Sequence, residues 1–354
     1  MAQTAPAKKM LIMNILDILK RYSDEDHKLS QKQIVDYLWS DYDMAADRKT
    51  VARNLTNLMA AGYPIECRDD IARTYINKQG KEQTSYILSD FYLEREFADA
   101  ELRLLIDSLL FSKHIPYNQC KELVEKLEGL SNQYFRSHVK HVRKLPETVT
   151  PNKELFWAIE VLDEAIEKGR QVVFDYNRYG TDKKLHPRQT SDGKVRAYVV
   201  NPYQMAATNG RYYLIGNYDK YNDFANYRLD RITNICLLDT PAKPKEQVKG
   251  GKQFSLSQHM AEHVYMFSGE SVPVTFRMKK EILDDVIDWF GIDVVFSDET
   301  EDEVTARVTV NWHAMHHWAL QYCRHVTVLS PPDLSEYVQK DFAEALERYK
   351  NCED

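Results

Sequence analysis

The spacing of apolar residues changes along the chain, and this change sets the main limit on its fold. Over residues 9–22, and again over 98–145, apolar side chains recur every three or four positions, as in amphipathic helices. Over residues 172–176 they alternate with polar ones, as in a β-strand. A chain of 354 residues that carries both patterns predicts a multidomain α+β protein with two or three domains.

The first 90 residues predict three helices followed by a β-hairpin. The first helix covers residues 9–22, a capping box at residues 30–33 begins the second, and Asp47 is a good N-cap for the third. Two strand-like segments, 65–68 and 84–88, then flank a polar stretch with basic residues. This is the layout of a winged helix-turn-helix, which we assign to residues 1–90.

The polar face of the third predicted helix is the strongest local sign of function. A recognition helix presents short polar and basic side chains to base edges and phosphates while its other face packs against the first two helices. The alternative is a solvated face on an ordinary three-helix bundle. We favour DNA binding because a basic hairpin follows. The predicted DNA-binding residues are Lys49, Thr50, Arg53, Asn57, Arg73 and Lys78. One such module binds weakly, so a homodimer on two half-sites is expected.

Charge and tyrosine are concentrated in the middle of the chain. The formal net charge is -7, yet residues 168–240 hold 12 Lys and Arg against 7 Asp and Glu, together with nine of the 22 tyrosines. Arginine and tyrosine together suit ligands that carry both phosphate and rings. The alternative is that strand tyrosines and surface arginines occur in any β-sheet. We favour a local site for an anion or a nucleotide.

Several short strands at close spacing predict a small β-barrel or sandwich in this middle segment. The order of its motifs, from 174–176 and 185–187 to Tyr212-Tyr213-Leu214 and 227–232, resembles the WYL domain of bacterial transcriptional regulators. Tyr212 replaces the usual tryptophan, and Asn226 stands where an arginine is frequent. The flanking segments are similar to the winged helix-turn-helix and the C-terminal WCX extension of these regulators.

The resemblance implies an Sm/SH3-like small β-barrel that senses a nucleotide or a nucleic acid through aromatic and basic residues. The positions that match the family are Tyr176, His186, Tyr213, Arg228 and Arg231. We add Arg178, Arg188 and Tyr203 because their chemistry suits phosphate or rings and they lie near the motifs.

The remaining segments complete the predicted domain organisation. Helical residues 91–150 link the first domain to the barrel of residues 151–240. Residues 241–255 are rich in Pro, Gly and Lys and predict an exposed linker, which we extend to residue 272. Residues 273–354 predict a β-α-β-β-α-β order, as in a ferredoxin-like α+β domain. Resemblance to WCX implies that this domain joins two protomers.

Histidines near the C-terminus form the one metal-like cluster in the sequence, with members His313, His316, His317, Cys323 and His325. They lack the glutamate of an H-E-x-x-H motif, and the neighbouring Trp312 and Trp318 indicate packing. The chain contains no P-loop, G-x-G-x-x-G or G-x-S-x-G motif. We therefore expect no metal, no cofactor and no enzymatic activity.

The sequence also favours a cytoplasmic, nucleoid-associated protein. It has no apolar run of the roughly 18–20 residues needed to span a membrane. Residues 1–9 do not resemble a secretory signal. The five cysteines are far apart and form no C-x-x-C pair.

Three functional hypotheses follow. The first is a transcription regulator that binds an operator in duplex DNA and senses a nucleotide or single-stranded effector. The second is an accessory protein whose barrel holds single-stranded RNA or DNA as its main task, with an N-terminal protein-interaction module. The third is a metal-dependent nuclease that uses residues 313–325.

Overall fold

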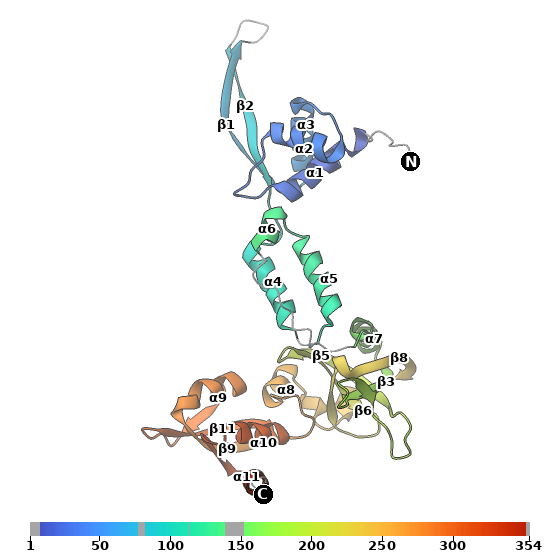
Figure 1. Cartoon of the computed structure of the whole chain (residues 1–354), viewed down its shortest axis with the longest axis vertical. Coiled ribbons are helices and arrows are strands. Elements are labelled where there is room, and N and C mark those ends of the chain that lie inside the picture. Colours follow the sequence, from blue (N-terminus) through green and yellow to red (C-terminus); the bar gives the residue numbers. More distant parts are fainter. Residues whose placement is uncertain (1–7, 77–81, 113, 139–151, 352–354) are drawn as a thin grey trace. The chain divides into compact units, whose positions relative to one another are not determined.

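A computed structural model of the chain describes residues 8–76, 82–112, 114–138 and 152–351. It divides the chain into two compact units, Met1–Val149 and Thr150–Asp354. The expected combination of helices and sheets is confirmed, because the described residues contain helices together with three antiparallel sheets. Each unit is described separately below (Figure 1).

Three helices form the core of the first unit. After a 3-10 turn, η1 (Lys8–Met10), come α1 (Leu11–Tyr22), α2 (Gln31–Tyr42) and α3 (Arg48–Ala60). The capping box of Ser30 and Gln33 begins α2, and the Asp47 side chain accepts a hydrogen bond from the Thr50 N–H at 2.8 Å to begin α3. The apolar faces of the helices pack together with Phe91 from the hairpin. The fully buried members are Ile15, Ile18, Leu19, Ile34, Leu38, Val51 and Leu55.

The hairpin after α3 is much longer than the sequence pattern predicts. β1 (Ile65–Ile76) pairs with β2 (Glu82–Leu93) in antiparallel register, with bulges between Glu66 and Ile71. Cross-strand pairing therefore continues through the polar stretch, where apolar alternation gives no signal. In Figure 1 the two strands extend beyond α1–α3. The side chains of residues 69–87 and the whole of residues 77–81 are outside the described part.

A small helical group completes the first unit, consisting of α4 (Asp99–Phe111), α5 (Tyr117–Glu128) and α6 (Gln133–His138). Its buried centre is Leu102, Ile106 and Phe135. Two polar contacts connect this part of the chain to the residues that follow α1. The guanidinium of Arg95, which precedes α4, donates to the Ser23 carbonyl at 2.7 Å, and Asn132 donates to Asp24 at 2.6 Å.

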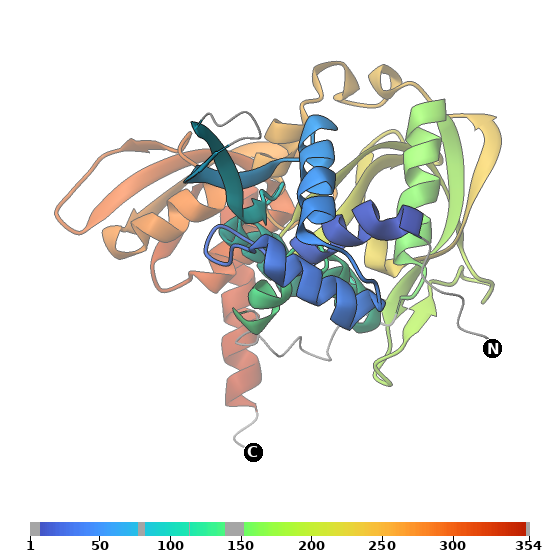
Figure 2. The same cartoon turned by 90° about the horizontal axis from the view of Figure 1, so that it is seen from above.

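The second unit begins with a helix packed on a six-stranded antiparallel sheet. The helix is α7 (Leu155–Lys168), and Figure 2 shows it running beside the strands. The strands are β3 (Arg170–Tyr179), β4 (Leu185–Pro187), β5 (Ala197–Thr208), β6 (Arg211–Tyr218), β7 (Phe224–Arg228) and β8 (Ile232–Pro241). Their order is β4-β3-β5-β6-β7. In addition, β8 pairs with β3 along the edge opposite to β5.

The sheet differs from the expected closed barrel. Among the described strands, β7 pairs with β6 alone and not with β8, because the 3-10 turn η3 (Leu229–Arg231) separates them. Side-chain hydroxyls bind two backbone N–H groups of β7 instead. Asn226 donates to Ser268 Oγ and Arg228 donates to the Tyr176 hydroxyl, each at 3.1 Å. The edge of β7 is thus covered without strand pairing.

Residues 241–272 are not the exposed linker that composition predicts. They contain η4 (Lys245–Gln247), η5 (Gly251–Gln253) and α8 (Leu256–Glu262), and they bury Val248, Val264 and Met266. Met266 packs against Tyr213 and Ile215 of β6. The chain folds back so tightly that a Cβ at Gly251 would lie 1.8 Å from the Lys245 carbonyl oxygen. Apolar contacts with the sheet therefore order a segment rich in Pro, Gly and Lys.

The C-terminal part is a second antiparallel sheet covered by helices. Along the chain come β9 (Ser271–Lys279), η6 (Lys280–Ile282), α9 (Leu283–Phe290), β10 (Val295–Ser297), β11 (Glu303–Asn311), α10 (Trp312–Gln321), β12 (Val326–Ser330) and α11 (Pro332–Lys350). The strand order is β10-β11-β9-β12, a split β-α-β arrangement. Trp318 of α10 is fully buried against Phe276 and Phe290.

None of the helices in the described part of the chain has the length and apolar character to cross a lipid bilayer.

Candidate functional site

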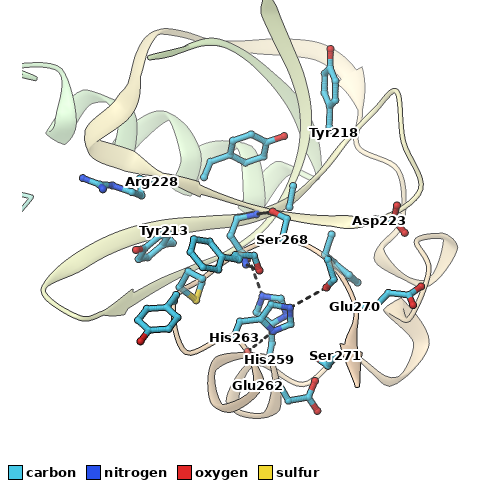
Figure 3. A pocket seen from close by; sticks show the side chains of 18 of the residues that line it. Tyr213, Tyr218, Asp223, Arg228, His259, Glu262, His263, Ser268, Glu270 and Ser271 are labelled. Carbon is cyan, nitrogen blue, oxygen red and sulfur yellow. Dashed lines mark hydrogen bonds between the residues drawn. The ribbon is translucent and has the colours of Figure 1, made fainter. Parts of the chain in front are cut away.

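A cavity of about 1330 Å³ lies in the second unit. One wall comes from β3, β5, β6, β7, η3 and the loops between them, and the other from residues 249–271, which follow the six-stranded sheet. We call this cavity the central pocket (Figure 3). It is larger than the roughly 300–1,000 Å³ of most small-molecule sites.

Four of the tyrosines that line the central pocket pack together, and Phe174 lies among them. The Tyr176 ring packs edge-on against Tyr198 and Tyr227, with centroids 5.9 and 5.3 Å apart, and Tyr218 lies 5.3 Å from Tyr198. Burial raises the pKa of Tyr176 and of Tyr227. Their hydroxyls are therefore neutral at physiological pH, when each can donate one hydrogen bond and accept others.

A buried carboxylate holds two of the pocket arginines. Asp230 is fully buried and accepts from Arg228 Nε at 3.0 Å and from Arg228 Nη2 at 2.5 Å. Arg211 Nη1 lies 3.6 Å from the same carboxylate. The fork of Arg228 thus uses its donors inside the protein, as expected for a bidentate pair.

Three other pocket arginines have no carboxylate within salt-bridge distance in the described residues. The guanidinium of Arg188 lies 5.4 Å from the Tyr176 ring centre. The guanidinium of Arg196 lies 4.8 Å from the Tyr198 ring centre and 5.2 Å from that of Tyr218. A hydrogen bond with Tyr218 raises the pKa of Arg196. The Nε atom of the third, Arg231, is buried without a hydrogen-bond acceptor in that part of the chain.

The second wall of the pocket contains a stacked pair of histidines from α8 and the residue after it. His259 and His263 have ring centres 3.9 Å apart. His259 Nε2 donates to Asn226 Oδ1 at 3.0 Å, and His263 Nδ1 lies 2.9 Å from the His259 carbonyl. Burial, and to a smaller extent the neighbouring His263, lowers the pKa of His259 to about 3. In Figure 3 both rings lie below Ser268, with Arg228 and Glu270 on opposite sides.

The resemblance noted in the sequence is confirmed for the middle of the chain, because residues 158–237 match the family model of the WYL domain. Residues 158–237 are a WYL domain. Its wall of the central pocket includes the four tyrosines and the arginines, whereas the histidine wall lies beyond residue 237.

Two solved structures are similar to the chain. One is proteasome accessory factor B/C (PafBC) of Arthrobacter aurescens, with 14% identity and a TM-score of 0.28 over 99% of this chain and 52% of that one. The chain thus spans about half the length of that structure. The other is described as a CRISPR Cas-related protein, with 12% identity and a TM-score of 0.36 over 99% of this chain and 88% of that one. No curated protein matches the chain.

The structure brings together five of the eight predicted ligand-binding residues. Those that line the pocket of the WYL domain are Tyr176, Arg188, Tyr213, Arg228 and Arg231. The other three are not among its lining residues. Arg178 is exposed on β3, His186 is exposed and bonds to Asp182 at 2.9 Å, and the Tyr203 hydroxyl donates to the Lys243 carbonyl.

Sequence reasoning missed Arg196, Tyr198 and Tyr218 of the WYL domain, and His259 beyond it. Alternation is the signal that points to Tyr198, since it lies opposite Phe174 on the neighbouring strand. For His259 the sequence offers only a histidine pair at i and i+4, which does not show that the helix folds back onto β7.

The structure describes the side chains of four of the six predicted DNA-binding residues. Lys49, Arg53 and Asn57 lie exposed along α3, and Thr50 is half-buried at its start. Within the described residues, neither Lys49 nor Arg53 has a carboxylate within salt-bridge distance. Arg73 lies on β1 but its side chain is outside the described part, as is the whole of Lys78. The solvent-exposed face of α3 therefore carries two basic side chains that a ligand could reach.

The histidines near the C-terminus do not converge. In the residues that the structure covers, no three His, Cys, Asp or Glu side chains are placed to hold one metal ion. His325, for example, bonds to Glu281 at 2.7 Å.

Proposed function

We propose that the chain is a DNA-binding transcription regulator whose central pocket senses an anionic ligand of the nucleotide type. The observation that carries this proposal is the composition of the pocket. Two arginines that have no carboxylate within salt-bridge distance among the described residues lie against tyrosine rings inside a WYL domain. Guanidinium and phenol groups in this arrangement bind phosphate and stack on bases. No catalytic step is assigned to the site.

The face of α3 supports the DNA-binding part of the proposal. The first unit has the order expected for a winged helix-turn-helix, with α3 as the recognition helix and β1–β2 as the wing. Lys49 and Arg53 are exposed on α3, and its apolar residues Val51 and Leu55 are fully buried. Such a helix can enter the major groove and leave the packing of its domain unchanged. Two protomers would read two half-sites.

The contacts of the second wall support a coupling between ligand binding in the pocket and the proposed association of two protomers. Glu270, which lines the pocket, directly precedes β9, and its carbonyl accepts from the Trp312 N–H at 3.1 Å. A ligand that shifts residues 259–270 would therefore act on the C-terminal sheet, which we propose joins two protomers. Regulation requires that the ligand bind one dimer geometry more tightly than the other.

The test is footprinting of the purified protein on the DNA upstream of its own gene. We expect a protected site for the wild type, its loss with Arg53→Ala, and retention with Lys20→Ala, an exposed lysine on α1. Equal protection by the wild type and Arg53→Ala would overturn α3 as the DNA reader.

The size of the pocket favours one alternative, an accessory protein that holds single-stranded RNA or DNA. The cavity of about 1330 Å³ exceeds the usual volume of small-molecule sites. Under this alternative Arg53→Ala changes no binding, and single strands bind through the pocket in the absence of a duplex site.

A further inference from the structure

Four of the five arginines that line the central pocket fall into two groups with different electrostatic partners. Arg211 and Arg228 share the buried carboxylate of Asp230. Arg188 and Arg196 contact aromatic rings, with no carboxylate partner in the described part of the chain. The two groups therefore differ in how many hydrogen-bond donors they can offer to a ligand.

Backbone pairing brings the second group together. The Arg196 N–H donates to the Arg188 carbonyl at 2.8 Å, and the Arg188 N–H donates to the Tyr176 carbonyl at 3.0 Å. The two guanidinium groups lie over Tyr198 and Tyr176, whose rings are 5.9 Å apart. Like charges on directly opposed residues are destabilising. An anion between them would remove this cost.

The tyrosines also orient the two guanidinium groups. A guanidinium over an aromatic face keeps its plane on the ring and its N–H donors at the edge, where a phosphate can accept them. The guanidinium of Arg196 lies near two neighbouring rings, 4.8 Å from the centre of Tyr198 and 5.2 Å from that of Tyr218, and these contacts reduce the side-chain freedom that binding would cost. Arg231 adds to the same pocket a buried Nε donor for which the described residues supply no acceptor.

Arg228 differs from Arg188 and Arg196 because it is paired with a carboxylate. Its Nε and Nη2 atoms are bonded to Asp230, and its side chain is 17% exposed. A phosphate at Arg228 would compete with a buried carboxylate that has few other partners. Breaking that pair would leave Asp230 charged and poorly satisfied.

We infer that a phosphate group of the ligand binds between Arg188 and Arg196, with Arg231 as a further donor, and that Arg228 is a positioning residue that holds Asp230. This inference rests on the proposed sensing role of the central pocket. The shared chemistry is a phosphate next to a ring, which a free nucleotide or a single-stranded nucleic acid can supply.

Binding to the intact protein tests the assignment with two probes. One is 5′-fluorescein-labelled hexathymidylate, followed by fluorescence anisotropy, and the other is ATP, followed by calorimetry. We expect Arg188→Gln and Arg196→Gln to weaken binding by about 10- to 100-fold each, as for loss of hydrogen bonds to a charged group. For the oligonucleotide, each variant should also reduce the dependence of log K on log salt by about 0.7.

The matched control is Arg178→Gln, an exposed arginine of the same WYL domain that is not a lining residue of the pocket. It should bind as the wild type does. Arg228→Gln should mainly lower the unfolding temperature, with little change in the affinity of the folded protein. If the arginine variants weaken the binding of ATP and only ATP is bound, the ligand is a free nucleotide. If they weaken the binding of the oligonucleotide and only the oligonucleotide is bound, the ligand is a single strand. Both outcomes support the inference.

Two results would overturn it, and they are distinguishable. If the wild type binds a probe and Arg188→Gln and Arg196→Gln bind it equally well, the phosphate position is wrong while the sensing role stands. If the wild type binds neither probe, the proposed sensing role fails and the phosphate position fails with it.

Discussion

The Nε2 atom of His259 lies 3.0 Å from Oδ1 of Asn226 and joins the WYL domain to the segment that follows it. An arginine side chain has donors only and could not accept this bond. An amide can accept from a neutral imidazole. Asn226 thus contributes one hydrogen bond between the WYL domain and α8, which belongs to the second wall of the central pocket.

Burial of His259 predicts a loss of stability in acid. Its pKa falls from 6.5 to about 3 on folding, so between these values the unfolded chain binds a proton that the folded protein does not. The free energy of unfolding should therefore decrease as pH falls from about 6.5 toward 3. In His259→Asn this dependence should become shallower, by at most about 1.4 kcal/mol per pH unit.

Urea unfolding at a series of pH values, followed by tryptophan fluorescence, measures this slope. The control is His313→Asn, an exposed histidine of α10, which should leave the slope as it is. An unchanged slope in His259→Asn would show that His259 is not a neutral buried group.

Removal of the Asp230 charge should destabilise the second unit strongly. Asp230→Asn leaves Arg228, and with it Arg211, without a compensating carboxylate next to a fully buried position. Loss of one partner of a buried ion pair costs about 3–5 kcal/mol. We expect a reduction of that size in the free energy of unfolding, measured with urea.

Asp239→Asn is the comparison for this prediction. Asp239 pairs with Arg170 on the same sheet, but its side chain is fully exposed. Solvent-exposed ion pairs contribute little to stability, so this variant should unfold close to the wild type. Similar losses in the two variants would mean that burial of Asp230 does not determine its contribution.

The capping box of α2 predicts a smaller loss of stability for a substitution in the first unit. Ser30→Ala removes the side-chain acceptor of the Gln33 N–H and should lower stability by about 1 kcal/mol. Thermal unfolding measured by circular dichroism follows this change. Thr56→Ala, an exposed position inside α3, should shift stability by no more than about 0.5 kcal/mol.

Trp318 predicts the largest packing effect in the C-terminal sheet. Its ring is fully buried, with ring centres of Phe276 and Phe290 at 5.4 and 4.9 Å. Trp318→Ala should cost about 3–5 kcal/mol through lost burial and the cavity left behind. Chemical denaturation measures this loss. The control is Ile292→Ala, because the Ile292 side chain is 90% exposed and its removal should change the free energy of unfolding little.

Local signals in the sequence were sufficient for the helices of the first unit. The Ser30 capping box, the Asp47 cap and apolar periodicity each act within one or two turns, so they can be read from neighbouring residues. Strand alternation at residues 172–176 is equally local. The length of the hairpin β1–β2 is not, because pairing with the opposite strand stabilises polar residues that carry no pattern of their own.

The sequence by itself determined the helices α1–α3, the strand alternation of residues 172–176, the basic middle segment and the resemblance of that segment to a WYL domain. Tertiary structure decided that the sheet stays open at β7, that residues 241–272 pack against it, and which pocket arginines have a carboxylate partner among the described residues. The reason is that helix caps and periodicity depend on neighbours in the chain. The partner of a charged side chain depends on residues that only folding brings near, as with Arg196, whose guanidinium lies close to the rings of both Tyr198 and Tyr218.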